Sequence, residues 1–240
     1  MLWVGSAPLS GDGHINISPK GGPDFFGIVS ASQFWFMDLT GSGVETTSHL
    51  HEPGNARICV MFIAFEGAPK IIRIWGKGRV IENDGAAGGE FAAFVEREKV
   101  KTIPGARSII LVDVEQCGSS CGFSVPFYEF KGYRNTLNDF FKKKQDGDMV
   151  KYWAYKSQLS VDGLPGMKRG YQYAQKNNVA PLKKFIGKAA PTRPLRAATQ
   201  ISVVQLLLVG ILSLVIGILA TLTMVSPEVV RRIQSKEVWA

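Results

Sequence analysis

Residues 57–82 read RICVMFIAFEGAPKIIRIWGKGRVIE, and this stretch decides the fold class. It holds two runs rich in Ile, Val and Phe, Arg57–Phe65 and Lys70–Glu82, separated by a short turn-like segment. Such runs, bounded by Gly and Pro, are typical of β-strands. Further strands are predicted at His14–Ser18, Gln33–Asp38 and Ser108–Gln116. We therefore expect residues 1–170, the head, to be mainly β and to form a mostly antiparallel barrel.

Helical patterns lie between and after these strands. Val44–His51 and Gly89–Arg97 are short candidates, and Thr136–Tyr155 is a longer amphipathic stretch with Leu137, Phe140, Phe141, Val150 and Trp153 on its apolar side. The head is thus expected to be an α+β domain in which helices flank the barrel.

The segment Ile201–Val225 runs for 25 residues without a charged side chain. At about 1.5 Å per residue it would extend roughly 37 Å as a helix, enough to cross a bilayer core with some tilt. The sequence therefore predicts a single transmembrane helix, followed by a short polar tail, Ser226–Ala240. This arrangement is typical of a tail-anchored membrane protein.

The net charge of +8 is distributed unevenly along the chain. Residues 1–170 hold 19 basic against 18 acidic side chains, whereas residues 171–200 hold six basic residues and no acid. Basic residues beside an apolar helix are attracted to anionic lipid headgroups and influence its orientation. We interpret residues 171–200 as a basic linker and not as a nucleic-acid footprint. The charge bias favours a cytosolic head, and the strongly apolar helix favours the endoplasmic reticulum over the mitochondrial outer membrane.

Cysteine and histidine give little sign of chemistry. Three cysteines are too few for a disulfide framework. Cys117 and Cys121 are read as structural thiols, with a redox pair as the alternative. His49 and His51 lie two apart on a predicted helix and face different sides, so no metal site is expected.

A possible phosphate cradle follows the strand that ends near Asp38. The residues Thr40-Gly41-Ser42-Gly43 form a Gly-rich turn that leads into a helix, with Thr46 in its first turn. Backbone N–H groups, hydroxyls and the helix start would together favour an anion. The alternative is structural, since Ser42 and Glu45 have the spacing of a helix capping box.

A second candidate lies on the predicted strand His14–Ser18. Alternation along this strand places Ser18 and Lys20 on one face, where both could reach the same phosphate. The alternative is a solvated lysine at the edge of the sheet.

Several separated segments together carry a family resemblance. They are APLSGDGHINISPKG, DLTGSGVETTSHL, ARICVMFIAFEG, IIRIWGKGRV, SCGFSVPFYEF and SVDGLPG. From about Trp3 to Met167, the chain resembles the pyridoxamine 5'-phosphate oxidase-like flavin split-barrel family. The resemblance implies a six-stranded antiparallel split barrel with flanking helices, usually a homodimer with flavin mononucleotide (FMN) in clefts between the subunits.

The resemblance also implies a set of cofactor-binding residues. They are Ser18, Lys20, Thr40, Ser42, Thr46 and Arg73. Arg73 has an alternative reading as a paired arginine on a barrel face. In better-characterised oxidases of this kind an Arg-Lys pair stands where Glu45 and Thr46 stand here, so vitamin B6 oxidation does not follow.

These observations predict a membrane-tethered, FMN-dependent oxidoreductase acting on an unknown small molecule. Flavin chemistry asks little of side chains, and no catalytic acid or base stands out. The alternatives are a non-catalytic barrel that binds a cofactor or a partner protein at a membrane surface, and a haem or deazaflavin binder on the same barrel.

Overall fold

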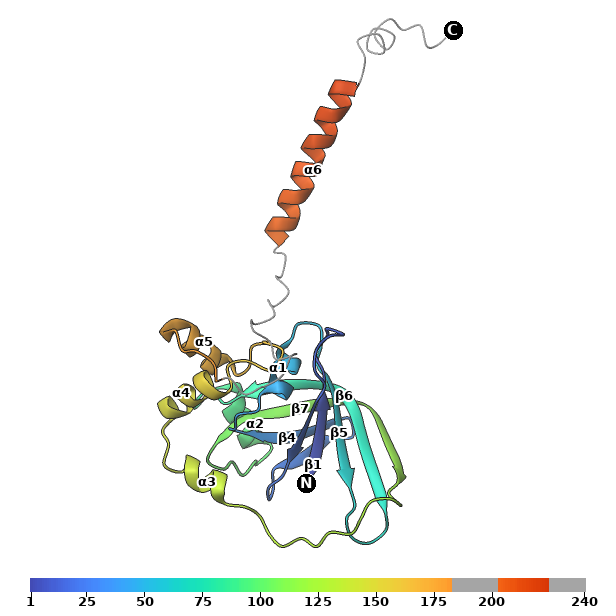
Figure 1. The fold of residues 1–240 in the computed structure, drawn as a ribbon, viewed down its shortest axis with the longest axis vertical. Coiled ribbons are helices and arrows are strands. Elements are labelled where there is room, and N and C mark those ends of the chain that lie inside the picture. Colours follow the sequence, from blue (N-terminus) through green and yellow to red (C-terminus); the bar gives the residue numbers. More distant parts are fainter. Residues whose placement is uncertain (183–202, 225–240) are drawn as a thin grey trace, which may run out of the picture. The chain divides into compact units, whose positions relative to one another are not determined.

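The computed structural model describes residues 1–182 and 203–224 and divides the chain into two compact units, Met1–Ala197 and Ala198–Ala240 (Figure 1). Every residue of both buried hydrophobic clusters belongs to the first unit. Because a domain is defined by its own core, we expect a fragment of residues 1–197 to fold by itself.

The first unit is built on one antiparallel sheet with flanking helices. Within residues 1–182, seven strands run in the order β2-β1-β5-β6-β7-β4-β3. The strands are β1 (Leu2–Ser6), β2 (Asn16–Lys20), β3 (Phe26–Ser30), β4 (Gln33–Leu39), β5 (Arg57–Ile63), β6 (Lys70–Glu82) and β7 (Ala106–Cys121). The expected antiparallel sheet with flanking helices is confirmed, but the expected count of six strands is wrong.

Residues 57–82, which contain β5 and β6, form the centre of the sheet. β5 pairs with β6 from Arg57↔Lys77 to Ile63↔Ile71, and β6 pairs with β7 along its whole length. Alternation places side chains such as Val60 and Ile81 in the core, where both are almost fully buried. Gly76, at a β-bulge, lies so close to the β7 backbone that a Cβ there would meet the carbonyl oxygen of Asp113.

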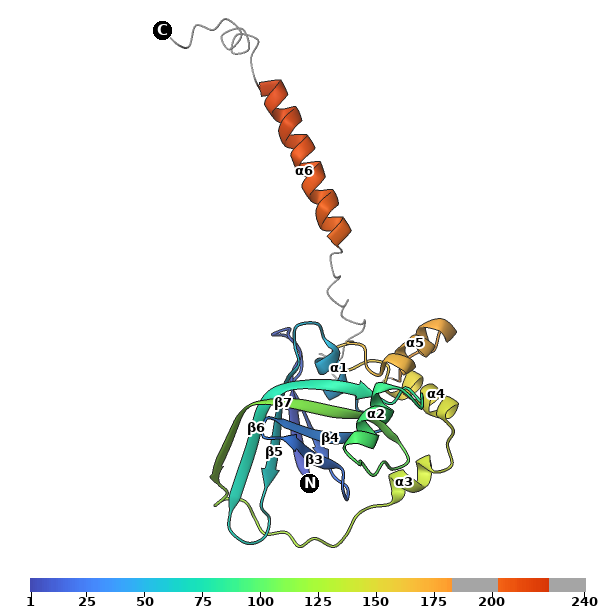
Figure 2. The same cartoon turned by 180° about the vertical axis from the view of Figure 1, so that it is seen from behind.

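The sheet curls so that its β3–β4 end approaches β5 (Figure 2). The ring of Phe62 on β5 lies 5.3 Å from that of Phe26 on β3 and 5.9 Å from that of Phe34 on β4. These aromatic contacts close the interior, and the main hydrophobic core lies inside the curl.

Two of the predicted helices are found and one is divided in two. Two short helices, α1 (Glu45–His51) and α2 (Glu90–Arg97), occupy their predicted places. The predicted single helix over 136–155 is wrong, because the structure divides it into α3 (Thr136–Phe141) and α4 (Asp146–Lys156). Gln145 and Asp148 form a capping box that starts α4 as a separate helix.

A further helix, α5 (Lys168–Asn177), extends into the predicted linker. Residues 171–177 are therefore helical and not part of an irregular linker. The helix packs on α4, since Gly170 lies so close to Trp153 that a Cβ there would meet the Trp153 Cβ at 2.5 Å. Ala174 is also buried.

The second unit contains one described helix, α6 (Val203–Met224), within the predicted membrane segment Ile201–Val225. Among the residues that the structure describes, no helix is found that is both long and apolar enough to cross a membrane. The anchor therefore stays a prediction. The ends of that segment, the linker from residue 183 and the tail 226–240 lie outside the described residues.

Candidate functional site

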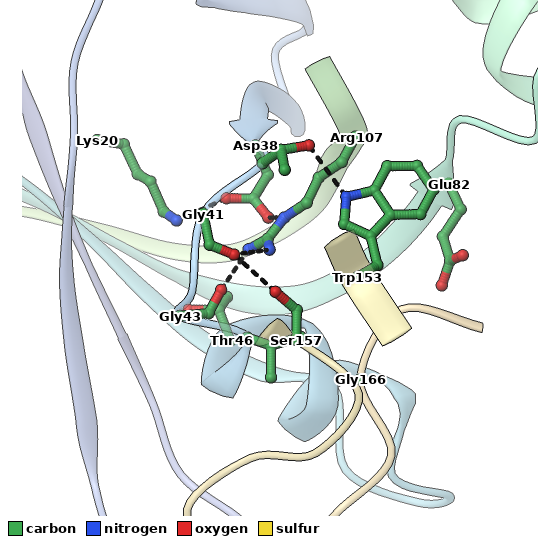
Figure 3. Close-up of polar contacts among 12 residues, drawn as sticks. Lys20, Asp38, Gly41, Gly43, Thr46, Glu82, Arg107, Trp153, Ser157 and Gly166 are labelled. Atoms are coloured by element: carbon green, nitrogen blue, oxygen red, sulfur yellow. Dashed lines mark hydrogen bonds and ion pairs between the residues drawn. The ribbon is translucent and has the colours of Figure 1, made fainter. Parts of the chain in front are cut away.

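A buried ion network joins the end of β4 to the inner face of the sheet (Figure 3). One carboxylate oxygen of Asp38 accepts a hydrogen bond from Lys20 Nζ at 2.6 Å, and the other accepts one from Arg107 Nε at 2.7 Å. Asp38 and Arg107 are almost fully buried, whereas Lys20 is 16% exposed. Lys20 is therefore the member of this network that a ligand could reach.

The two cations hold Asp38 in its charged form. Burial alone would raise the pKa of this carboxyl, but the opposing charges and hydrogen bonds of Arg107 and Lys20 outweigh burial and lower the pKa to about 2. Two positive charges face one negative charge, so the network has a net charge of +1 at neutral pH.

The Gly-rich turn after β4 directs carbonyl groups toward Arg107. The Arg107 guanidinium donates to the carbonyl oxygen of Gly43 at 2.8 Å and, more weakly, to that of Gly41 at 3.4 Å. Ser157 Oγ also donates to the Gly41 carbonyl, at 2.6 Å. The sequence predicted that N–H groups of this turn would face an anion, but the described contacts use its carbonyl groups to satisfy a buried arginine.

Thr40 is fixed by the same part of the fold. Its backbone N–H donates to the Gly105 carbonyl at 2.7 Å, and its hydroxyl oxygen accepts a hydrogen bond from Trp153 Nε1 at 3.1 Å. Thr40 is only 1% exposed. It therefore acts as a link between β4 and α4, and its predicted role as a cofactor ligand is not tested by these contacts.

A second polar group lies at the start of β2, around Asn16. The Asn16 amide nitrogen donates to Ser18 Oγ at 3.0 Å and to Thr46 Oγ1 at 3.2 Å. Asn16, Ser18 and Lys20 pair with the buried residues of β1, so all three point to the inner face. The predicted sharing of a face by Ser18 and Lys20 agrees with this register.

The predicted capping box is wrong. Helix α1 begins at Glu45 with Val44 at the N-cap, and no side chain caps it. Glu45 instead accepts a hydrogen bond from the Val44 backbone N–H through Oε2, at 2.9 Å. Ser42 thus lies before the cap position, because the turn extends two residues further than its sequence suggests.

Arg73 does not join the other predicted residues. Arg73 on β6 lies opposite Met61 on β5, which lies opposite Trp3 on β1. The neighbouring row across the same strands contains Val60 and, on β2, Ser18. Neighbouring rows of a sheet point to opposite faces. Arg73 therefore lies on the outer face, where it donates to Ser120 Oγ at 3.2 Å, and the reading as a barrel-face arginine fits the structure better.

The histidines hold loops and strands together. Asp162, which is 4% exposed, accepts from the His14 backbone N–H at 2.8 Å and lies 2.6 Å from His14 Nδ1. His49 Nδ1 bonds Ser6 Oγ at 2.9 Å, and burial lowers the pKa of His49. No group of three or more possible metal ligands is found among the described residues.

His51 and Glu82 form a partly buried pair beside the start of α5. His51 Nε2 lies 3.4 Å from Glu82 Oε1 without a hydrogen bond, while Nδ1 bonds the Gly166 carbonyl oxygen at 3.2 Å. Burial, aided by the charge of Lys168, lowers the pKa of His51 to about 4. His51 is therefore neutral at pH 7. Burial also raises the pKa of Glu82.

Cys117 and Cys121 are free thiols on the exposed part of β7. Four residues of strand separate their Cα atoms by about 13 Å, which is too far for a disulfide. The alternative reading as an intramolecular redox pair is therefore wrong.

The sequence analysis missed several members of the site. Arg107, Trp153 and Ser157 come from segments far from the Gly-rich turn, and Asn16 stands beside residues that were selected. One signal was present, because an aspartate inside the apolar strand FWFMDL needs a buried cation.

The chain is similar to a known protein over most of its length. The chain is 38% identical over 182 residues to the pyridoxamine 5'-phosphate oxidase family protein ustO of Aspergillus flavus, and the match covers 70% of each chain. No family model matches. Among solved structures, HupZ of Group A Streptococcus matches 53% of this chain and 89% of its own, with 15% identity and a TM-score of 0.37. The FAD binding protein from Mycobacterium smegmatis matches 50% and 83%, with 12% identity and a TM-score of 0.33.

Proposed function

Because the chain belongs to the pyridoxamine 5'-phosphate oxidase family, we propose that its head is an FMN-dependent oxidoreductase in which Ser18, Lys20 and Thr46 hold the cofactor phosphate. The flavin ring supplies the electron-transfer chemistry, and the protein supplies position and electrostatics. The substrate is an unknown small molecule.

The observation that carries the proposal is the direction of the Asn16 hydrogen bonds. The Asn16 amide donates to both the Ser18 and the Thr46 oxygens, at 3.0 and 3.2 Å. A hydroxyl that accepts a bond from an amide still has its own proton to donate. Ser18 Oγ donates to Asn16 Oδ1, but this contact is long, at 3.5 Å, and a phosphate oxygen could replace it. Two hydroxyl donors of fixed position are what a phosphate oxygen requires.

Charge supports the same site. Lys20 projects from the same face as Ser18, and the network of Lys20, Asp38 and Arg107 carries a net positive charge. Asp38 fixes the position of the ammonium group, since their contact is 2.6 Å. Lys20 would add attraction for a dianionic phosphate without having to be ordered when the phosphate binds.

A non-catalytic cofactor-binding or scaffold barrel is the second candidate, and Glu45 favours it. Glu45 Oε1 is buried without a hydrogen-bond partner among the described residues, at the start of the helix that carries Thr46. A buried negative charge near the proposed phosphate would weaken binding.

Two further proposals concern the setting of the head. The 25-residue uncharged stretch and the basic residues before it support a single-pass membrane anchor, with the head in the cytosol and the endoplasmic reticulum as the preferred membrane. Ile17 on β2 and Ile28 on β3, the two edge strands, are both exposed. They support a homodimer, since a second subunit would cover this apolar surface.

Titration of the full-length chain with FMN and with riboflavin, which lacks the phosphate, tests the phosphate site. We expect FMN to bind more tightly than riboflavin. Ser18→Ala and Thr46→Val should each weaken FMN binding about tenfold, since a hydrogen bond to a charged group contributes about 1.5 kcal/mol. Riboflavin binding should not change.

Ser119→Ala is the matched control for Ser18→Ala, because Ser119 is an exposed serine on β7. Equal affinities of the wild type for FMN and riboflavin would contradict the assigned phosphate site.

A further inference from the structure

A pocket of about 420 Å³ lies between α2, α3, α4 and the segment that leads into β7. Its apolar side is formed by Phe91, Ile103, Phe141, Met149 and Trp153. Its volume lies within the range typical of small-molecule sites, and its lining combines these apolar side chains with about as much polar surface. The pocket is separate from the proposed phosphate site, since none of the phosphate-binding residues lines it.

The solvent-exposed edge of the pocket, its mouth, carries two lysines. Lys142 and Lys144 both line it and are exposed. Lys142 Nζ is 3.9 Å from Asp139 Oδ1, and both side chains are 65% exposed, so this pair contributes little. Lys144 Nζ lies 5.4 Å from the centre of the Phe140 ring.

One carboxylate, that of Asp146, also lines the pocket. Arg169 donates to both of its oxygens, at 2.8 and 2.5 Å. The hydrogen bonds from Arg169 also lower the pKa of Asp146. This two-bond pair neutralises the acid, and the two lysines therefore determine the charge at the mouth.

We propose that this pocket binds an amphipathic organic anion, with the apolar part against the aromatic side and the carboxylate or phosphate group at Lys142 and Lys144. The apolar side favours burial of a ring or chain, and the two exposed lysines line the same pocket and would attract a terminal anionic group.

The pocket also adjoins the candidate site through Thr40. Two of its lining residues, Trp153 and Gly105, hold the Thr40 side chain and backbone at 3.1 and 2.7 Å. If the head is a flavin enzyme, we infer that the anion bound here is its substrate, and this assignment of a substrate rests on the proposed function. The inference that the pocket binds an anion does not depend on the proposed function.

Calorimetric titration of the full-length chain with 2-naphthoate and with its neutral amide, 2-naphthamide, tests the proposal. The two probes share one apolar body and differ in charge. We expect the wild type to bind 2-naphthoate about tenfold more tightly than the amide, because two exposed cations face the carboxylate.

Lys142→Gln/Lys144→Gln should remove this preference and leave amide binding unchanged. Lys143→Gln is the matched control, since Lys143 is exposed and adjacent but does not line the pocket. Thr102→Trp, at the exposed edge of the pocket, should weaken both probes by obstructing entry.

Equal affinity of the wild type for the two probes, a preference that survives in the double variant, or unchanged binding of both probes to Thr102→Trp would overturn the proposal. FMN content is measured on the same samples. Naphthoate binding without FMN binding would refute the proposed function and leave the pocket assignment standing.

Discussion

Replacing Asp38 by Asn tests the electrostatic organisation of the site. The substitution keeps the shape of the side chain but removes the charge that faces Arg107 and Lys20, at 2.7 and 2.6 Å. Arg107 is 3% exposed, so its charge would stay buried without its carboxylate partner. Breaking such a buried pair typically costs about 3–5 kcal/mol of the free energy of unfolding.

The pKa of Asp38 gives a second estimate of how much the charged carboxylate contributes to the free energy of unfolding. The pKa is lowered from 3.8 to about 2, and each unit corresponds to about 1.4 kcal/mol, so the charged form contributes roughly 2 kcal/mol at neutral pH. A carboxyl whose pKa is lower in the folded state contributes stability above its unfolded pKa. The wild type should therefore lose this contribution as the pH falls from about 4 to about 2.

Urea denaturation of the fragment 1–197, followed by tryptophan fluorescence, measures the effect. At pH 7 we expect Asp38→Asn to lose about 2–5 kcal/mol and to show a flatter pH dependence between pH 4 and pH 2 than the wild type. Asp12→Asn is the control, because Asp12 is an exposed acid whose side chain has no described partner. A loss below 0.5 kcal/mol in Asp38→Asn would refute the reasoning.

Three further outcomes are expected. Thr40→Val removes the acceptor for Trp153 Nε1 and should destabilise the fragment by about 1–3 kcal/mol, measured by urea denaturation, because a buried donor is left unpaired; an unchanged midpoint would contradict this link. Gly170→Ala places a Cβ 2.5 Å from the Trp153 Cβ and should cost about 1–3 kcal/mol in the same assay, whereas Gly147→Ala, with open space around it, should cost less than 1 kcal/mol. The His51 ring should titrate near pH 4 by NMR, and since its folded pKa lies below 6.5, its contribution to stability should fall as the pH drops from about 6.5 to about 4; titration near pH 6.5 would show that the ring is not buried as described.

The central strands could be predicted because their signal is local. β5 and β6 combine β-branched residues with a clear alternation, and the turn between them carries Gly and Pro. β1 and β3 have only five residues each, and β3 has an irregular register beside Ser30. Runs this short become strands because neighbouring strands pair with them, which a single sequence does not reveal.

The candidate site also contains residues that local sequence predicts and residues whose position depends on tertiary structure. Ser18 and Lys20 were placed on one face by alternation alone, and the β1–β2 register agrees. The position of Arg73 depends on how β6 aligns with β5 and β1, and that register is a tertiary property. Arg107 was missed for a related reason, because its pairing with Asp38 spans 69 residues of sequence.

The interpretation of the Gly-rich turn changed for a physical reason. Both predicted readings used the turn's N–H groups or the Ser42 hydroxyl, and neither considered the carbonyl groups. A buried guanidinium has five N–H donors to satisfy, and Asp38 accepts from only one of its nitrogens, so the carbonyls of Gly41 and Gly43 serve the other two.

The central claim is that the head carries out redox chemistry with bound FMN. The most direct measurement is the visible absorbance of the full-length chain, saturated with FMN and freed of excess cofactor, under anaerobic addition of NADPH or NADH and then of oxygen. We predict that bound flavin bleaches with a reduced nicotinamide and that its absorbance returns with oxygen. A chain that retains no flavin, or whose bound flavin stays oxidised with both donors, would contradict the claim.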